Sequence, residues 1–208
     1  MLVWGVARLL FSYTVTGAER LPARGAAVIV ANHVSWLDPI LTALALPRKP
    51  AFLAMEELWR MPVIGMVMRI YGPLAIPLNR GTVDATALKR SLRALESGAL
   101  LIVFPEGGIS PSGELRPFHR GAAMLAARAR APLIPVAVEG TDEALPLGRM
   151  VPRRRPVTVH VGTPIVPASP QREDLERASE AAAAQIQALR GRSSPAVNAS
   201  PPRPGPPG

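Results

Sequence analysis

The chain has 208 residues, of which 48% are hydrophobic, a length that suits one domain with a sizeable core. It contains no cysteine, which excludes disulfides and thiol chemistry. The formal net charge of +9 attracts nucleic acid, anionic lipid or phosphorylated molecules. Aromatic residues are only 4% of the chain and none lies among the basic positions as a nucleic-acid stacking platform needs, so we expect an anionic membrane surface or phosphate-bearing substrates and no nucleic acid.

The N-terminal segment, residues 1–12, is apolar and predicts a short helix whose one charged residue is Arg8. No window of the chain reaches the roughly 18 uninterrupted apolar residues of a membrane-spanning helix. We therefore expect this segment to lie in the plane of a membrane, with Trp4 and Phe11 as interface anchors. A helix buried in the core is the alternative.

Residues 13–190 alternate between strand and helix patterns, which predicts an α/β domain with a mainly parallel or mixed central sheet flanked by helices. The expected strands are residues 13–16, 28–31, 51–55, 72–78, 100–104, 133–138 and 157–161. The expected helices are residues 39–46, 83–97, 118–130 and 171–190.

Two further segments have distinct compositions. Residues 58–71 are apolar nearly all round, which is typical of a segment that is wholly buried or dips into lipid. Thr82 is expected to cap the helix that follows at 83–97. Residues 191–208 consist mostly of Pro, Gly, Ser and Arg, and we expect this tail to be disordered.

The strand at 28–31 ends in a polar turn that contains His33 and, five residues later, Asp38. If a helix begins after Ser35, the carboxylate can reach one ring nitrogen of the imidazole and leave the other nitrogen facing outward as a general base. In the alternative interpretation, His33 caps a helix and Asp38 pairs with an arginine. This stretch alone favours neither.

A second strand, residues 100–104, ends in Pro105 followed by Glu106, Gly107 and Gly108. Because the carboxyl ends of parallel strands meet at one edge of a sheet, this turn and the His33 turn are expected to line one crevice. Paired glycines leave room and free amides for an anion, and Arg80, also after a strand, is a candidate phosphate ligand.

Other chemistries lack their motifs. There is no Gly-x-Ser-x-Gly elbow and no phosphate loop of the Walker type, which argues against a serine hydrolase and a P-loop nucleotidase. The three histidines, His33, His119 and His160, are not at metal-site spacings, so we expect no metal site.

Four blocks of the sequence resemble the lysophosphatidic acid (1-acylglycerol-3-phosphate) acyltransferase family. NHVSWLD at residues 32–38 matches the NHxxxxD signature of these glycerolipid acyltransferases. GPLAIPLNR at residues 72–80, FPEG at 104–107 and LIPVA at 133–137 resemble the next three blocks, in the family's order. The resemblance covers roughly residues 15–167 and implies a glycerol-3-phosphate acyltransferase-like fold, a small N-terminal helical element packed on an α/β core.

The third block departs from the family pattern. The family usually continues with Thr-Arg-Ser, whereas residues 108–110 read Gly-Ile-Ser, so Ile109 replaces an expected phosphate-binding arginine. Downstream, His119 stands where the family has a lysine. Arg116 and Arg120 are the candidates to substitute for the lost charge, and the departure puts the identity of the acceptor in doubt.

The resemblance implies transfer of a fatty acyl group from acyl-CoA or an acyl carrier protein to a lysophospholipid, most of all 1-acylglycerol-3-phosphate, giving phosphatidic acid. The thioester is a co-substrate, and no other cofactor is implied. One alternative is a related acyltransferase that acts on glycerol-3-phosphate, another lysophospholipid or a lyso-ornithine lipid. A second is a non-catalytic lipid-binding protein. The implied location is the cytoplasmic face of a bacterial cell membrane, as a peripheral or monotopic protein.

In this family the histidine and aspartate of the first block act as catalytic base and orienting carboxylate, roles that fall here on His33 and Asp38. Backbone amides near Gly107, or at the helix after Ser35, are expected to bind the oxyanion. The full set of expected substrate-binding residues is Asn32, Ser35, Arg80, Glu106, Gly107 and Gly108.

Overall fold

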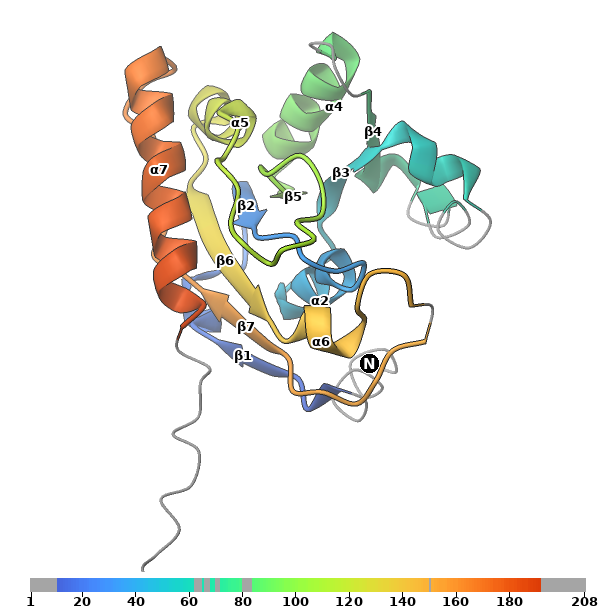
Figure 1. Ribbon diagram of the computed structural model, residues 1–208. Coiled ribbons are helices and arrows are strands. Elements are labelled where there is room, and N and C mark those ends of the chain that lie inside the picture. The colour runs from blue at the N-terminus through green and yellow to red at the C-terminus, as the bar shows by residue number, and fades with distance from the viewer. Residues whose placement is uncertain are drawn as a thin grey trace, which may run out of the picture.

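A seven-stranded sheet organises the computed structural model, with the strand order β1-β7-β6-β2-β5-β3-β4 (Figure 1). The structure describes residues 11–61, 65, 68–69, 72–79, 84–149 and 151–191. The expected N-terminal helix lies outside the described residues except for its last residue, Phe11. Phe11 is 6% exposed and packs in the core, so the expectation that it is a membrane-interface anchor is wrong. Arg80, Thr82, most of residues 61–71 and the C-terminal tail beyond Gly191 also lie outside the described residues.

The strands form where the sequence concentrates apolar and β-branched residues. They are β1 (Thr14–Thr16), β2 (Ala27–Ala31), β3 (Ala51–Met55), β4 (Ala75–Leu78), β5 (Leu100–Val103), β6 (Leu133–Glu139) and β7 (Thr158–Val161). All neighbouring pairs are parallel except β6 and β7, which are antiparallel. The predicted fold class, a mainly parallel or mixed sheet flanked by helices, is confirmed.

Helices connect these strands. They are α2 (Asp38–Ala45), α4 (Ala85–Glu96), α5 (Gly121–Ala129), α6 (Thr141–Ala144) and α7 (Arg172–Leu189), with short 3₁₀ turns η1 (Ala18–Arg20), η2 (Glu56–Arg60) and η3 (Gly72–Leu74). No helix within the described residues is both long enough and apolar enough to cross a membrane.

Two expected helix starts are corrected. The cap of α4 is Asp84, whose Oδ1 accepts a hydrogen bond from the Ala87 amide at 2.9 Å. This bond is the main reason that the pKa of the Asp84 carboxyl lies below its usual value. Helix α5 begins at Gly121 instead of residue 118, because the amide of His119 donates to the carbonyl of Pro105 at 3.0 Å and holds the preceding segment extended.

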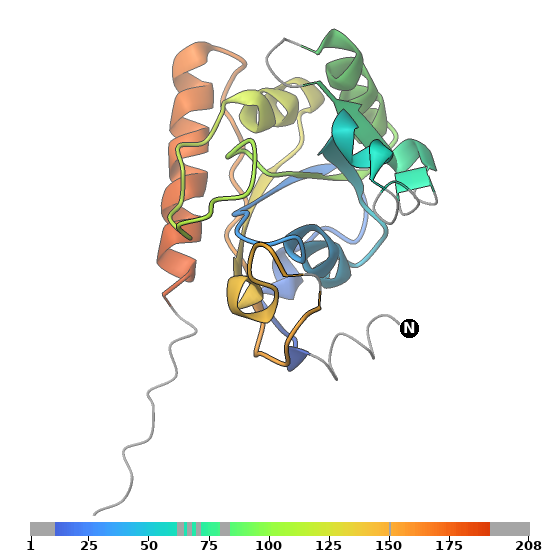
Figure 2. The ribbon, with the colours of Figure 1, turned by 45° about the vertical axis from the view of Figure 1, so that its right-hand side comes forward.

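The sheet is covered on both faces, as Figures 1 and 2 show. Side chains of β2 alternate between the two covers: Val28 and Val30 pack in one cluster with α4, α5 and α7, and Ile29 and Ala31 in another with α2 and α6. Such two-sided burial explains why this strand is a continuous apolar run.

Strand β2 lies at the centre of the sheet, between β5 and β6. Both neighbours are parallel to it, with Ile29 opposite Ile102 on one side and Ile134 on the other. The turn that leaves β2 is therefore flanked by the carboxyl ends of two other strands. This is the edge at which α/β proteins place their ligands.

Candidate active site

At the end of β2, the side chain of Asn32 makes the hydrogen bonds to β6 that the backbone of a strand would make. Its Nδ2 donates to the Val138 carbonyl at 2.9 Å and its Oδ1 accepts from the Val138 amide at 2.8 Å. The side chain thus continues the pairing with β6 and is fully buried. Because the side chain satisfies β6, the backbone of Asn32 is free to turn away from the sheet toward His33.

The carboxylate of Asp38 organises that turn. Its Oδ2 accepts hydrogen bonds from the amides of Val34 at 2.6 Å and Ser35 at 2.7 Å, and it lies 3.0 Å from His33 Nδ1. A carboxylate only accepts hydrogen bonds, so Nδ1 of the imidazole carries the proton and donates. The Nε2 atom is then left with a lone pair, which is the state a general base requires.

Helix α2 holds this carboxylate in place. Asp38 is the first residue of the helix and is 0% exposed, and a negative charge is favourable at a helix N-terminus. The buried hydroxyl of Tyr13 donates to the Leu41 carbonyl at 2.6 Å and ties α2 to the start of β1. Burial raises the pKa of this hydroxyl, so it remains a donor.

The ring of His33 is supported by an aromatic neighbour. Its centroid lies 4.3 Å from that of Phe104, with 30° between the planes, and the side chain is 13% exposed. Phe104 directly follows β5, so the strand next to β2 supplies the surface on which the imidazole rests. We did not anticipate this contact from the sequence, although an aromatic residue just before Pro105 was a signal.

Glu106 joins the second turn to the first. Its Oε1 accepts from the His33 amide at 2.8 Å and its Oε2 from the Arg116 amide at 3.0 Å. The His33 carbonyl in turn accepts from the Ser110 amide at 2.7 Å. Glu106 is 5% exposed, so its two oxygens serve the protein backbone. These hydrogen bonds hold the two turns next to each other at the same edge of the sheet.

One amide that we expected to bind an oxyanion, that of Gly107, is engaged elsewhere, as are two amides that lie just before the helix that follows Ser35. The Gly107 amide donates to the Phe104 carbonyl at 3.1 Å within its turn, and those of Val34 and Ser35 donate to Asp38. Gly107 is required there by its left-handed conformation, with φ of 74°.

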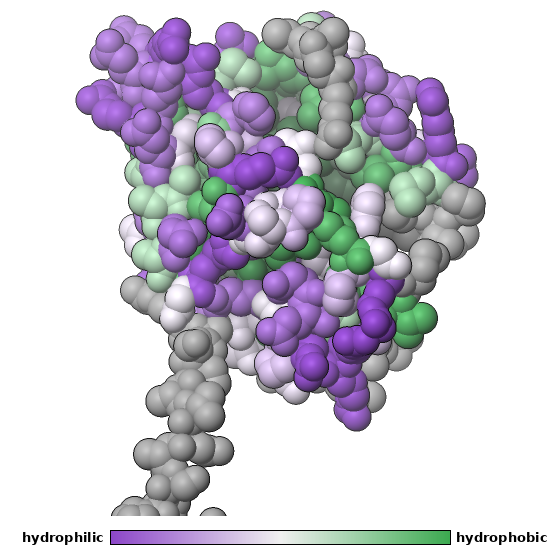
Figure 3. Space-filling view, in the orientation of Figure 1, coloured by the Kyte–Doolittle hydropathy of each residue, from purple (hydrophilic) through white to green (hydrophobic). Residues whose placement is uncertain are grey.

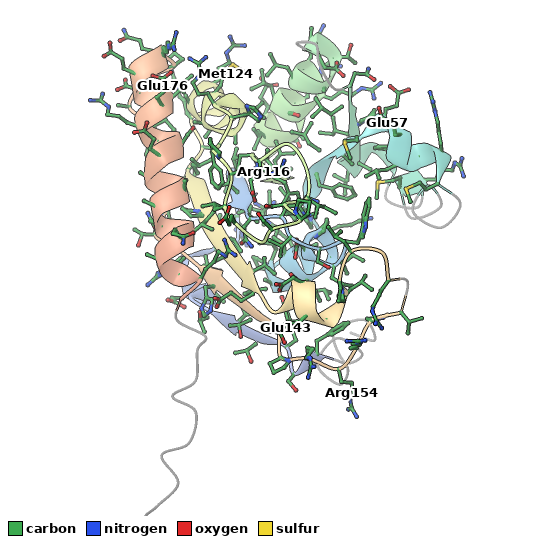
Figure 4. All side chains as sticks on the ribbon, viewed as in Figure 1. Glu57, Arg116, Met124, Glu143, Arg154 and Glu176 are labelled. Atoms are coloured by element: carbon green, nitrogen blue, oxygen red, sulfur yellow. The ribbon has the colours of Figure 1, made fainter. Side chains whose placement is uncertain are left out.

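Of the two arginines that could replace the charge missing at Ile109, Arg116 lies at this turn. Its guanidinium donates from Nη2 to the carbonyls of Gly108 at 2.7 Å and Ile109 at 2.5 Å, and Figure 4 shows it near the centre of the molecule. Arg120 instead pairs with Glu176 on α7, at 3.4 Å. The cation beside the altered block is thus supplied from a position seven residues after Ile109.

A hollow of about 980 Å³ lies between α6, α7 and the loop around Gly113, and Val34 is part of its lining. Its lining includes the four carboxylates of Glu114, Glu139, Asp142 and Glu143 and one basic side chain, that of Arg190. Such a lining repels a phosphate, so a phosphorylated ligand fits the Arg116 side of the site better than this hollow.

The structure brings together His33, Asp38, Glu106, Gly107 and Gly108. Asn32 and Ser35 belong to the same turn but are buried completely, and the Ser35 hydroxyl donates to the Leu145 carbonyl at 3.0 Å. Both side chains shape the turn from beneath, which does not fit the expectation that they contact substrate. The place of Arg80 is outside the described residues.

The burial of Asn32 leads to a pH-dependent prediction for Asn32→Asp. A buried carboxyl has a raised pKa in the folded state, so the folded variant holds a proton above the unfolded value of about 3.9. Its stability relative to wild type therefore falls as pH rises. At about pH 4 the protonated group can still donate to Val138. At about pH 7 we expect the free energy of unfolding of the variant to be about 3 kcal/mol lower than that of wild type, as measured by urea unfolding of both proteins. A difference that becomes smaller as pH rises would contradict the structural role of the Asn32 side chain.

Comparison with known proteins places this geometry in a family. A family model described as Acyltransferase matches residues 12–139. The chain is 37% identical over 139 residues to the chloroplastic 1-acyl-sn-glycerol-3-phosphate acyltransferase BAT2 of Brassica napus, a match that covers 64% of this chain and 39% of that protein. It is 28% identical over 180 residues to the 1-acyl-sn-glycerol-3-phosphate acyltransferase of Bacillus subtilis, covering 84% of this chain and 86% of that protein.

A solved structure shares the fold. The crystal structure of the 1-acyl-sn-glycerophosphate (LPA) acyltransferase PlsC from Thermotoga maritima matches with a TM-score of 0.71 and 30% identity, over 88% of this chain and 73% of that one. The chain thus spans about two fifths of the length of the Brassica relative and most of the bacterial ones. Both turns of the site lie within the part matched by the family model, and the chain belongs to the acyltransferase family.

Proposed function

We propose that this protein transfers an acyl group from an acyl thioester, acyl-CoA or an acyl carrier protein, to the free hydroxyl of 1-acylglycerol-3-phosphate, giving phosphatidic acid. The observation that carries the proposal is the bond of 3.0 Å between His33 Nδ1 and Asp38 Oδ2, which leaves the Nε2 lone pair for an incoming hydroxyl. The activities named for the Brassica, Bacillus and Thermotoga relatives support this acceptor.

The reaction follows from the tautomer of His33. A hydroxyl is a weak nucleophile at neutral pH, so Nε2 removes its proton as the oxygen attacks the thioester carbonyl. The tetrahedral intermediate then collapses, the carbon–sulfur bond breaks, and the imidazolium returns the proton to the thiolate. The carboxylate of Asp38 stabilises the positive ring between these steps. The protein is not acylated, and the proposal requires no metal or cofactor beyond the thioester.

The acceptor's phosphate is assigned to Arg80, with Arg116 as the second cation. A guanidinium matches a phosphate better than an ammonium because its donors form a planar fork. Ile109 in place of arginine keeps a second candidate open, an acyltransferase of the same chemistry with another acceptor such as glycerol-3-phosphate or a different lysophospholipid. We place the enzyme on the cytoplasmic face of a membrane, where a lipid acceptor resides.

Replacement of the base tests the mechanism. His33→Ala is expected to lower transfer by about 10²–10⁴-fold, because it removes the Nε2 lone pair that takes the hydroxyl proton. The readout is thiol release from acyl-CoA with 1-acylglycerol-3-phosphate present, alongside urea unfolding to show that the variant is folded. Undiminished turnover in the folded variant would contradict the proposed mechanism.

Arg80→Ala tests the phosphate contact. Loss of a charge-assisted bond to the acceptor is expected to raise the acceptor KM about tenfold or more, with the donor KM unchanged. Arg128→Ala, at an exposed position of α5, is the matched control and should change neither constant. Equal effects of Arg80→Ala on both KM values would argue against this assignment.

Glu106→Gln distinguishes two roles for this residue. The amide can accept a hydrogen bond from only one of the two backbone amides that Glu106 now binds, so the His33 turn is loosened. We expect kcat to fall about tenfold or more with little change in either KM. If Glu106 instead contacts the acceptor's hydroxyl, the acceptor KM should rise while kcat changes less.

A further inference from the structure

We infer that an exposed arginine-rich surface beside the His33 turn docks on an anionic lipid bilayer. The arginine surface, as we name it, consists of Leu147, Arg149, Val151, Arg153, Arg154 and Arg155. It lies in the connection between α6 and β7, which runs beside α2 in both ribbon views (Figures 1 and 2). The inference deepens the proposed function, since a lipid acceptor has to be reached in a membrane.

Exposure of this connection is continuous over its described residues. Residues 147–149 and 151–156 are all exposed. Figure 4 shows Arg154 at the periphery, directed away from the sheet. One ion pair is formed by Arg155, with Glu143 at 3.6 Å. Strongly hydrophilic residues gather at the lower right of the space-filling view, next to a hydrophobic one (Figure 3).

Apolar side chains are concentrated at the same place. Six large hydrophobic side chains are exposed among the described residues, and four of them belong to this region: Trp36, Ile40, Leu147 and Val151. Val151 is 75% exposed and Ile40 51%. Trp36 lies in the turn just before α2 and Ile40 in the first turn of that helix, so both exposed apolar side chains are at the start of the helix beside which the connection runs.

Hydrogen bonds connect this surface to the catalytic turn. The Arg153 amide donates to the Ala144 carbonyl at 2.7 Å, and the next carbonyl, that of Leu145, accepts from the Ser35 hydroxyl at 3.0 Å. Ser35 is three residues from Asp38 and its amide binds that carboxylate. A bilayer that holds the connection therefore also sets the distance of His33 from the lipid surface.

The mixture of charge and apolar side chains selects a bilayer as the partner. Arginines alone would suit any polyanion, but a soluble polyanion leaves Leu147, Val151 and Ile40 in water. An anionic bilayer accepts both parts: each arginine near its surface contributes about 1 kcal/mol, and tryptophan and aliphatic tips enter the headgroup boundary. None of the exposed large hydrophobic residues that the structure describes belongs to α4, whose basic face carries Lys89, Arg90 and Arg93.

The test is vesicle flotation with the full chain, on phosphatidylcholine vesicles with and without phosphatidylglycerol. The first variant carries Arg149→Gln, Arg153→Gln and Arg154→Gln. Its matched control carries Lys89→Gln, Arg90→Gln and Arg93→Gln on α4, at the opposite end of the molecule (Figure 1). Each variant lowers the formal net charge by three, from +9 to +6. At about fivefold for each arginine, the first should bind anionic vesicles roughly 100-fold more weakly, whereas the control should bind like wild type.

A second pair of variants tests the apolar part. Val151→Asp should weaken binding, while Val166→Asp, at a position 74% exposed on another part of the surface, should not. If the triple arginine variant and the triple α4 variant weaken vesicle binding equally, binding depends only on net charge and the inference is overturned. Unchanged vesicle binding of the arginine variant would also overturn the inference. This holds too if the variant instead loses binding to a purified acidic acyl carrier protein.

Activity is read separately, on a short-chain acceptor that is monomeric in solution. The arginine variant should retain transfer to this acceptor and lose transfer to 1-acylglycerol-3-phosphate embedded in anionic vesicles. Loss of both would assign these arginines to the site itself and overturn the docking role. Absence of transfer by the wild-type protein would reject the proposed function and leave the flotation result standing on its own.

Discussion

One oxygen of Asp38 accepts hydrogen bonds from two backbone amides and one imidazole, and the rest of the site depends on it. Without that oxygen the amides of Val34 and Ser35 would be buried donors with no partner, at about 1–3 kcal/mol each. The turn, the first residue of α2 and the tautomer of His33 would be lost together. Asp38, which we propose orients the base, is thus also the residue that holds the loop around His33 in its fold.

The imidazole is therefore held from two directions. Asp38 fixes its ring from the side of α2, and Glu106 fixes its backbone from the turn after β5. Since Glu106 also binds the amide of Arg116, the base and the cation beside Ile109 share one carboxylate. A change of side chain at Gly108 or Ile109 leaves the link between the turns in place, because that link joins the Glu106 carboxylate to backbone amides.

Much of this arrangement follows from local sequence. Apolar runs such as residues 28–31 predict buried strands, and a spacing of five residues allows Asp38 to reach His33. The hydrogen-bond partners of Asn32 and Glu106 could not be predicted. The bond from Asn32 to Val138, for example, joins residues that are 106 positions apart, and such a contact produces no periodic pattern in the sequence. The same holds for the antiparallel direction of β7 and for the start of α5, which a carbonyl in a distant turn decides.

The central place of β2 has a consequence for the order of synthesis. Its neighbours, β5 and β6, come from residues 100–103 and 133–139, so the pairing has high contact order and is slow to form. During synthesis, β2 gains β5 as a neighbour only after residue 103 and β6 only after residue 139. The nascent protein thus exposes an apolar strand that invites chaperone binding, and the His33 turn can bind Glu106 only after about half of the chain has been synthesised.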